Sequence, residues 1–234
     1  MDKQQVKYQD LGIIDYKSAW DYQEVLLKEN VDIKTAARIA GSSDIATNHH
    51  FLICEHKPVY TLGKSGNISN VLINDEDREQ KEIEFFRTNR GGDITFHGLQ
   101  QIVGYPILDL EKFYTDIGKY LRNLEEVIIL TIGEYGIKGE RSSGETGVWI
   151  SPGIKGYERK ICAIGVRCSR WITMHGFALN VNTDLDYFRH IIPCGIENKQ
   201  VTSIEKETGN KVDYEEVKEK IRRNFQSVFE VEII

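Results

Sequence analysis

Two adjacent glycines, a threonine and a histidine stand just before an apolar run in the first half of the chain. They are Gly91, Gly92, Thr95 and His97, and the apolar run covers residues 102–108. Because glycine has no Cβ, a ligand can lie against the backbone there and accept hydrogen bonds from its N–H groups. The apolar run predicts a buried strand. The stretch therefore indicates one wall of a binding site, held in place by a strand.

A thiol and an amine further along the chain could supply a nucleophile and a base. Cys194 lies between Pro193 and Gly195, and Lys160 opens a second apolar run. An ammonium group stabilises a neighbouring thiolate, and a desolvated neutral lysine can act as a base. Taken alone, a cysteine is more often a small buried hydrophobe and a lysine is usually solvated. The pair is therefore a hypothesis that the fold has to permit.

The spacing of the strands permits a pair of Cys194 and Lys160. Residues 160–168 and 172–181 predict two strands with a very short connection, which favours an antiparallel hairpin. Lys160 then lies roughly opposite Asn180, and Cys194 follows 14 positions later, after a segment that could form a turn of helix. The chain can thus return Cys194 to the Lys160 end of the hairpin.

The remaining elements follow from hydrophobic periodicity. Amphipathic spacing predicts helices that begin near Tyr16, near Phe113 and after Asp213, whose side chain can cap the last one with Glu216 three residues on. Further strands are expected at 51–54 and 59–62. Strands interrupted by helices predict an α/β fold of the α+β type, a mixed β-sheet flanked by helices.

Several motifs in this order resemble those of one enzyme family, the lipoyl(octanoyl) transferases. The motifs are Arg90–His97 with the following strand, residues 56–63, 147–150, 160–167, 171–180, 192–196 and 201–204. Residues 147–150 are similar to the family's central strand. One departure is that the family usually reads Pro-Gly-Gln after the histidine and glycine, where this chain has Leu99-Gln100-Gln101. A positive φ at Gln100 would cost about 1 kcal/mol, so the turn after His97 is expected to follow another path or to be mobile.

The resemblance implies a fold like the catalytic domain of biotin and lipoate protein ligases, and an acyltransferase activity. It implies that an octanoyl or lipoyl group passes from acyl carrier protein to a lysine of lipoyl-domain proteins, such as the E2 subunits of 2-oxoacid dehydrogenases and the glycine cleavage H protein. Cys194 would carry the acyl thioester, with Lys160 as its partner. Neither ATP nor a metal would be needed, since the acyl group arrives on the phosphopantetheine of the carrier. The implied substrate-binding residues are Arg90, Gly91, Gly92, Asp93, Ile94, Thr95, Phe96, His97, Ala163, Ile164, Gly165, Gly176, Phe177 and Ala178.

Two other classes of function remain open. An ATP-dependent lipoate or biotin protein ligase would share the fold and the glycines but would not need Cys194. A non-catalytic module that binds acyl carrier protein would leave Cys194 inert. The presence of both Lys160 and the Pro193-Cys194-Gly195 turn favours the transferase. His97 is expected either to be a core or loop histidine whose hydrogen bonds go to the backbone, or to orient the thioester carbonyl.

Composition limits the partners. With 234 residues, 40% hydrophobic and 28% charged, the chain is expected to form one domain over residues 1–234. The formal net charge of −6 argues against nucleic acid, but five basic residues between Gly153 and Trp171 suggest a docking face for an acidic partner. No run approaches a membrane span and no signal peptide is visible, so a cytoplasmic protein with reduced thiols is expected.

Overall fold

The computed structural model describes residues 3–42, 45–192 and 200–234. A large mixed sheet runs through the molecule in the order β12-β1-β2-β6-β10-β9-β8-β7, with β11 added beside β9. Its strands are β1 Gln5–Ile13, β2 His49–Glu55, β6 Gln101–Ile107, β7 Glu140–Ser142, β8 Glu145–Ile150, β9 Arg159–Ser169, β10 Ile172–Asn180, β11 Gln200–Val201 and β12 Glu232–Ile233. The pairs β1·β2, β1·β12 and β9·β11 are parallel and the others antiparallel. The predicted mixed sheet is confirmed.

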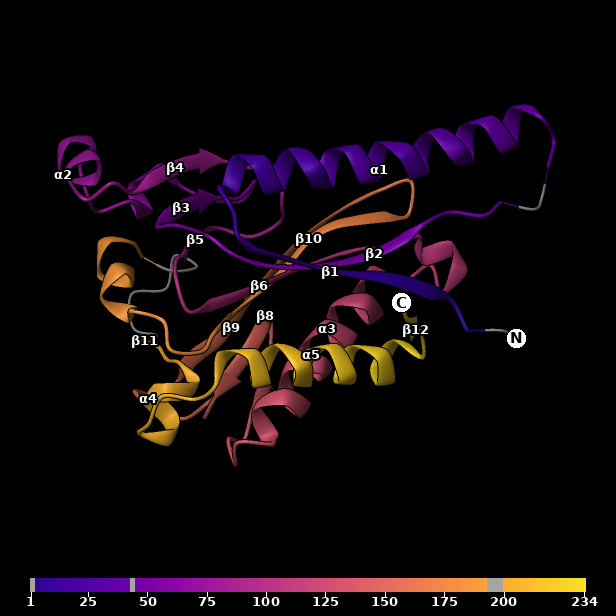
Figure 1. Ribbon diagram of the computed structural model, residues 1–234. Helices are drawn as coiled ribbons and strands as arrows, with labels where there is room; N and C mark the ends of the chain where they lie inside the picture. The colour runs from indigo at the N-terminus through magenta and orange to yellow at the C-terminus, as the bar shows by residue number, and fades with distance from the viewer. Residues whose placement is uncertain (1–2, 43–44, 193–199) are drawn as a thin grey trace.

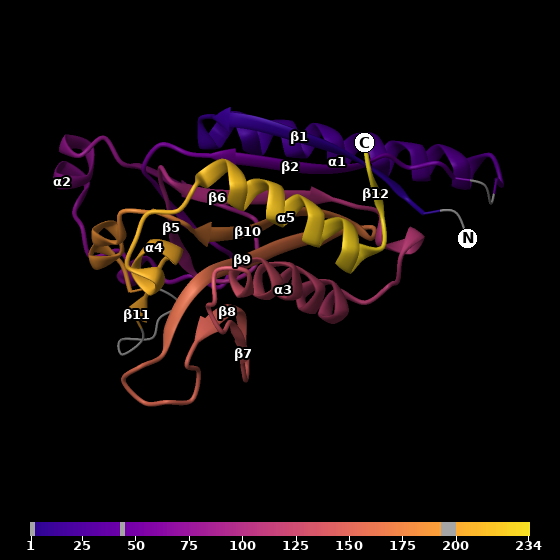
Figure 2. The same cartoon turned by 60° about the horizontal axis from the view of Figure 1, so that its bottom comes forward.

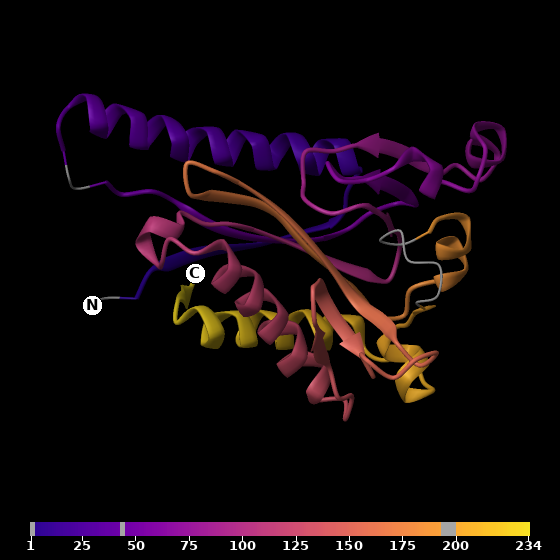
Figure 3. The same cartoon turned by 180° about the vertical axis from the view of Figure 1, so that it is seen from behind.

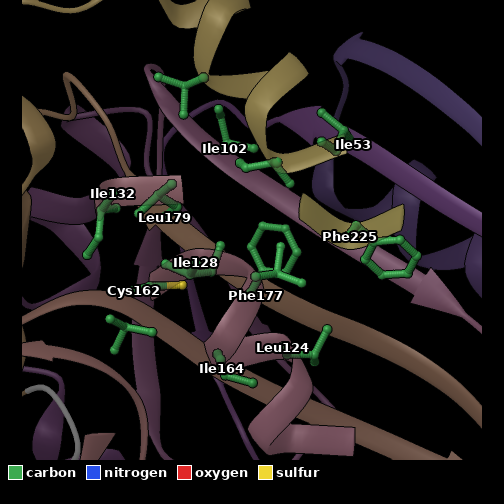
Figure 4. Close-up of a cluster of buried hydrophobic side chains, with 14 of the residues drawn as sticks. Ile53, Ile102, Leu124, Ile128, Ile132, Cys162, Ile164, Phe177, Leu179 and Phe225 are labelled. Atoms are coloured by element: carbon green, nitrogen blue, oxygen red, sulfur yellow. The ribbon is translucent and has the colours of Figure 1, made fainter. Parts of the chain in front are cut away.

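Helices cover both faces of this sheet. The long helix α1 (Tyr16–Ile39) lies along one face, and α3 (Ile117–Gly133) and α5 (Tyr214–Phe229) lie along the other (Figures 1 and 3). The core beneath α3 and α5 contains Phe177, Cys162 and Ile164 from the sheet together with Leu124 and Ile128 from α3 (Figure 4). Two short helices, α2 (Asp75–Gln80) and α4 (Ile204–Thr208), and three 3₁₀ turns, η1 (Ile68–Asn70), η2 (Leu110–Lys112) and η3 (Leu185–His190), complete the fold.

The predicted helices are present, although one begins later than expected. α1 starts at Tyr16 as predicted, and Asp213 caps α5 by accepting from the backbone N–H groups of Glu215 and Glu216. α3 begins at Ile117 instead of near Phe113. The reason is its cap, because the Asp116 side chain accepts from Lys119 N at 2.9 Å and so fixes the first turn.

The predicted hairpin is also present. β9 and β10 pair antiparallel with Leu179 opposite Cys162, which places Lys160 one position from the expected alignment with Asn180. Residues 147–150, expected in a central strand, instead belong to β8, whose outer neighbour β7 is only three residues long. The strand lies near the edge of the sheet because only this short hairpin partner follows it (Figure 2).

A second, three-stranded sheet lies beside the start of α1. Its order is β4-β3-β5, where β3 is Val59–Leu62, β4 Glu84–Arg87 and β5 Ile94–His97. Stacking of the Tyr16 ring on His97, with centroids 5.8 Å apart, connects this sheet to α1. Across residues 3–42, 45–192 and 200–234, no helix combines the length and the apolar composition that crossing a bilayer requires.

Candidate active site

A cavity of about 710 Å³ lies between β5 and the middle of the β9–β10 hairpin. Thirteen of the fourteen residues proposed as substrate-binding line it, and so does Lys160. The exception is Phe96, whose ring stacks on Tyr187 with centroids 4.6 Å apart in the apolar core of the small sheet. Along β5, Thr95 and His97 face the cavity and Phe96 the opposite side, while Ile94, at the start of the strand, belongs to both the cavity lining and that core.

Small residues on β9 and β10 line the cavity on the side of the large sheet. They are Ala163, Gly165, Gly176 and Ala178. Two of them are glycines because other backbone segments cross there. A Cβ on Gly165 would lie 2.7 Å from Gly91 O, and one on Gly176 would lie 2.1 Å from Gly104 O. Close packing therefore already explains both glycines, without a ligand.

The stretch from Arg90 to His97, here called the glycine wall, forms the opposite side. The backbone N–H of Gly91 donates to Val166 O at 2.9 Å. This N–H is therefore committed to β9, which corrects the expectation that it would be available to a ligand. The Arg90 guanidinium donates to Thr61 O at 2.6 Å, to Thr61 Oγ1 at 2.9 Å and to Gly91 O at 3.0 Å. Arg90 thus braces the wall.

A β-bulge directs Lys160 into the cavity. In the pairing of β8 with β9, Trp149 lies opposite Lys160 and Val148 lies opposite Cys162, so that Ile161 is an extra residue. Ile161 and Cys162 both belong to the core beneath α3 and α5, whereas Lys160 lines the cavity with Ala163. Without the extra residue, strict alternation would place Lys160 on the same face as Cys162. The bulge therefore decides which face the lysine occupies.

Aromatic and backbone contacts hold Lys160 at one end of the cavity. Its Nζ lies 4.6 Å from the centroid of the Trp149 ring, and its side chain is largely buried. Val201 of β11 pairs with Lys160 in a parallel register, and Thr202 N donates to Lys160 O at 2.9 Å. Lys160 is therefore fixed by its neighbours at this end of the cavity, with its Nζ over an aromatic ring.

His97 is held by two side chains. Gln101 Nε2 donates to Phe96 O and to Asn180 Oδ1, so its Oε1 faces His97 Nδ1 at 2.9 Å as an acceptor. The Nδ1 atom therefore carries the proton, and Nε2 can accept from Thr61 Oγ1 at 3.3 Å. Burial and the nearby positive groups keep the pKa of His97 well below its usual range. His97 is thus a neutral residue held by hydrogen bonds in the protein.

The other two histidines near the cavity are also neutral. Burial lowers the pKa of His56 to about 4 and that of His175 to about 3. His56 Nδ1 donates to Ile14 O at 2.8 Å, and its Nε2 accepts from the Tyr105 hydroxyl at 2.8 Å. His175 Nε2 donates to Asn89 Oδ1 at 2.8 Å. Neither imidazole is basic enough to take a proton from an amine or a thiol at neutral pH.

A chain of buried hydrogen bonds connects the glycine wall to the backbone of Lys160. Gln101 joins His97 to Asn180, and Asn180 Nδ2 donates to Thr202 O at 2.9 Å. Since Thr202 N donates to Lys160 O, the imidazole and the lysine are parts of one network. Sequence reasoning did not assign Gln101 or Asn180 to the site, although both stand inside the quoted motifs. Val103 and Tyr105, in the strand that follows the glycine wall, also line the cavity, and so does Tyr16, which stands outside the quoted motifs. Sequence reasoning named none of the three as a site residue.

Cys194 lies outside the described residues. The other three cysteines of the chain are poor candidates for a nucleophile. Cys54 and Cys162 are buried, and burial raises the pKa of both thiols. Burial also raises the pKa of the half-buried Cys168, which lies near the far end of β9 from Lys160.

The turn after His97 does not avoid a positive φ at Gln100. Gln100 has a φ of 61°, and its N–H donates to Glu55 Oε2 at 2.6 Å. Its carbonyl accepts from Val181 N and Asn182 N, and its side chain accepts from Asn182 Nδ2. The turn is therefore tied down by hydrogen bonds that offset the left-handed conformation of a non-glycine residue.

The basic residues between 153 and 171 do not form one patch. Arg159 opens strand β9 and Arg170 directly follows its last residue, so they are separated by about 36 Å of extended chain. Arg159 forms a bidentate ion pair with Glu207 at 2.5 and 2.6 Å, and Arg170 donates to Thr35 Oγ1. The expectation of a single docking face was wrong, because the strand spreads these charges along its length.

Residues 15–226 match the family model of the lipoyl protein ligase A/B catalytic domain. The chain is 57% identical over 230 residues to an octanoyltransferase of Christiangramia forsetii, with 98% of this chain and 97% of that protein covered. It is 58% identical to an octanoyltransferase of Flavobacterium psychrophilum, with 98% of both covered. The chain therefore belongs to the lipoyl protein ligase A/B catalytic domain family, and within it to the acyltransferases.

Solved structures of this family share the fold. A bi-partite lipoate protein ligase from Thermoplasma acidophilum superposes with a TM-score of 0.70 at 14% identity, covering 100% of this chain and 86% of that one. A lipoate-protein ligase A bound with ATP gives 0.70 at 12% identity, covering 100% and 88%. These similarities confirm the predicted likeness to the ligase catalytic domain.

Proposed function

We propose that this chain transfers an octanoyl or lipoyl group from acyl carrier protein to a lysine of lipoyl-domain proteins, through a thioester on Cys194. The observation that carries the proposal is a lysine, Lys160, at one end of a mainly apolar cavity whose histidines are held neutral. The curated relatives over nearly the whole chain are octanoyltransferases, which supports the choice of acyl group. The E2 subunits of 2-oxoacid dehydrogenases and the glycine cleavage H protein are the acceptors that we expect.

The first step is exchange between two sulfurs. The Cys194 thiolate attacks the thioester carbonyl, the bond from that carbon to the carrier sulfur breaks, and the carrier leaves as a thiol with the proton from Cys194. This exchange is nearly balanced in energy, so neither ATP nor a metal is needed. Lys160 would relay the proton between the two sulfurs. The raised pKa values of Cys54, Cys162 and Cys168 support the choice of the fourth cysteine.

The second step forms an amide. The acceptor lysine attacks the acyl group on Cys194, the carbon–sulfur bond breaks, and the proton lost by the amine is taken up through Lys160. An amide is more stable than a thioester, so this step runs downhill. Val201 pairs with Lys160, and Phe188 lines the same cavity, so described residues on both sides of the 193–199 segment adjoin this site.

Mass spectrometry of the intact protein tests this mechanism. Incubated with octanoyl carrier protein in the absence of ATP, metal and acceptor, the chain should gain one octanoyl group, and peptide mapping should place it on Cys194. Added lipoyl-domain protein should remove the group. Cys194→Ser should prevent acylation, and Lys160→Ala should slow both half-reactions by at least about 100-fold. Cys168→Ser is the matched control, and should behave like the unmodified chain.

The alternatives give different results. A ligase would gain no mass until free acid and ATP were added, and would then hold a noncovalent adenylate. A carrier-binding module would retain acyl carrier protein without becoming acylated. Acylation of Cys54, Cys162 or Cys168 would keep the enzyme class and refute Cys194 as the nucleophile.

A further inference from the structure

The cavity is lined by more residues than those to which the family motifs assign substrate contacts. Near Ile164 it is also lined by Ile117 and Leu121 of α3, by Val166, and by residues 144–146 at the start of β8. We call this part the distal limb. Its side chains are apolar except for those of Glu145 and Thr146, in contrast to the Lys160 end of the cavity.

The distal limb exists because β8 and β9 separate. The two strands pair only from Arg159 to Cys162 of β9. The same register would bring Thr146 opposite Ile164, yet the described strands make no pairing there. Gly147 directly precedes the last paired residue of β8, Val148, and has a φ of 118°, a conformation that favours glycine. The edge of β9 is therefore open beside Ile164.

Helix α3 forms one side of the distal limb. Glu125 Oε1 accepts from Gly147 N at 3.0 Å, which fixes the register of α3 against β8. Leu121 lies one helical turn before Glu125, and Ile117 one turn before Leu121. These two side chains thus face the part of β8 that precedes Gly147. Lys160 lies beside Trp149, which follows Gly147 along the same strand.

From Lys160 to Val166 the strand advances six residues, or about 20 Å. An extended octanoyl chain starting from a thioester near Lys160 is much shorter than this. The cavity is therefore longer than an octanoyl chain, and the distal limb, which belongs to the same cavity, adds a mostly apolar lining suited to a methyl-terminated chain.

We infer that the distal limb binds the methyl-terminal part of acyl chains longer than octanoyl, and that Leu121 and Ile117 determine chain-length specificity. This inference rests on the proposed function for the identity of the ligand as an acyl chain. Each further methylene that enters the limb should tighten binding by up to about fourfold, because burial of one methylene contributes about 0.8 kcal/mol.

Calorimetric binding of octanoate and dodecanoate, each below its critical micelle concentration, tests the limb directly. The unmodified chain should bind dodecanoate at least tenfold more tightly than octanoate. Leu121→Trp fills the limb and should weaken dodecanoate binding at least tenfold more than octanoate binding. Ile117→Trp should have the same effect on the ratio of the two affinities, and it replaces Leu121→Trp in the test if that variant does not fold. Leu130→Trp, a change at an exposed position of the same helix, should leave the ratio unaltered.

The same variants should change the rates of acyl-enzyme formation from octanoyl and dodecanoyl carrier proteins in the same way. Leu121→Trp and Ile117→Trp should slow the dodecanoyl reaction more than the octanoyl reaction, and Leu130→Trp should not. Equal affinities of the unmodified chain for the two acids would overturn the inference, as would loss of both affinities to the same extent in Leu121→Trp. Absence of any acyl-enzyme would refute the proposed function, while the binding ratios would still decide whether the limb holds a chain.

Discussion

Glu125 holds Gly147 against the strand that carries Lys160. Its fully buried carboxylate accepts from Gly147 N at 3.0 Å and pairs with Arg122 at 2.8 Å and Arg141 at 3.1 Å. A Cβ on Gly147 would lie 2.6 Å from Cys162 O and 3.5 Å from Lys160 Cε. A helix residue thus positions the strand segment on which the lysine side chain lies.

Gly147→Ala should therefore impair both folding and acyl transfer. The new methyl group cannot fit against Cys162 O, so β8 has to move away from β9 and Lys160 loses its support. We expect a loss of at least about 2 kcal/mol in the free energy of unfolding and a tenfold or greater fall in acyl-enzyme formation. Gly136→Ala is the control, because Gly136 also has a positive φ but open space around it and does not line the cavity. Equal losses of transfer in the two variants would contradict this relationship.

Asn180→Ala tests the network between His97 and Lys160. The change removes the side-chain donor of the buried Thr202 O, at a cost of about 1–3 kcal/mol, and one of the two acceptors of Gln101 Nε2, which keeps its bond to Phe96 O. It should lower kcat by at least tenfold with a much smaller effect on the KM for carrier. Asn182→Ala removes three hydrogen bonds, one with Gln100 and two with Val212, but lies outside the network. If both variants lose stability and only stability, the network has no positioning role.

Acid should destabilise the fold through its neutral histidines. Burial keeps the folded-state pKa of His49 and His56 at about 4 and of His175 at about 3, and that of His97 lower than usual. In the unfolded chain these groups titrate near pH 6.5. Between pH 6.5 and 4 the unfolded state therefore binds protons that the folded state does not, so stability is complete above pH 6.5 and falls as the pH falls.

Calorimetric unfolding at pH 5 in buffers of different ionisation enthalpy measures this uptake. We expect about four protons from the four histidines together. An uptake of fewer than about two would mean that some of them are charged in the folded protein. The kcat profile should likewise show no histidine ionisation between pH 6 and 8.

Local pattern was enough to predict α1, α5 and the β9–β10 hairpin, because each depends on periodicity or on a short connection. The bulge at Ile161 was not predictable in this way. It is set by the pairing of β9 with β8, and one extra residue changes the face of every side chain on one side of it. The sequence motif identified Lys160, but only the register shows that it faces the cavity.

The hydrogen-bond partners of backbone groups could not be predicted from the sequence either. The local sequence would allow the N–H of Gly91 to donate either to a ligand or to a neighbouring strand. In the structure it donates to Val166 O. Ile117 and Leu121 have the spacing of ordinary core residues of a helix, so their place in the distal limb follows only from the separation of β8 and β9. Long-range packing decides such roles.

The turn after His97 gives a prediction about the departure from the family pattern. Gln100→Gly should relieve about 1 kcal/mol of strain and lose the hydrogen bond from Asn182 Nδ2. The two effects nearly cancel, so stability and transfer should change little. Glu55→Ala should cost more, because it removes the acceptor of Gln100 N. Chemical denaturation compares the two, and a larger loss in Gln100→Gly would show that the side chain itself organises the turn.

Charge reversal near β9 should change the KM for acyl carrier protein, by an amount that depends on which end of the strand carries the substitution. Lys155 is exposed in the turn before β9, at the Lys160 end, whereas Arg170 lies beyond the far end. If the acidic carrier docks where its thioester can reach the cavity near Lys160, Lys155→Glu should raise the KM for carrier severalfold, and added salt should reduce that difference, since surface charges are screened beyond about 10 Å at 0.1 M. Arg170→Glu should leave this KM unchanged. Arg159→Glu should mainly lower stability, because it breaks the ion pair with Glu207. A KM that rises with Arg170→Glu and not with Lys155→Glu would place the carrier at the opposite end of the hairpin and contradict this orientation.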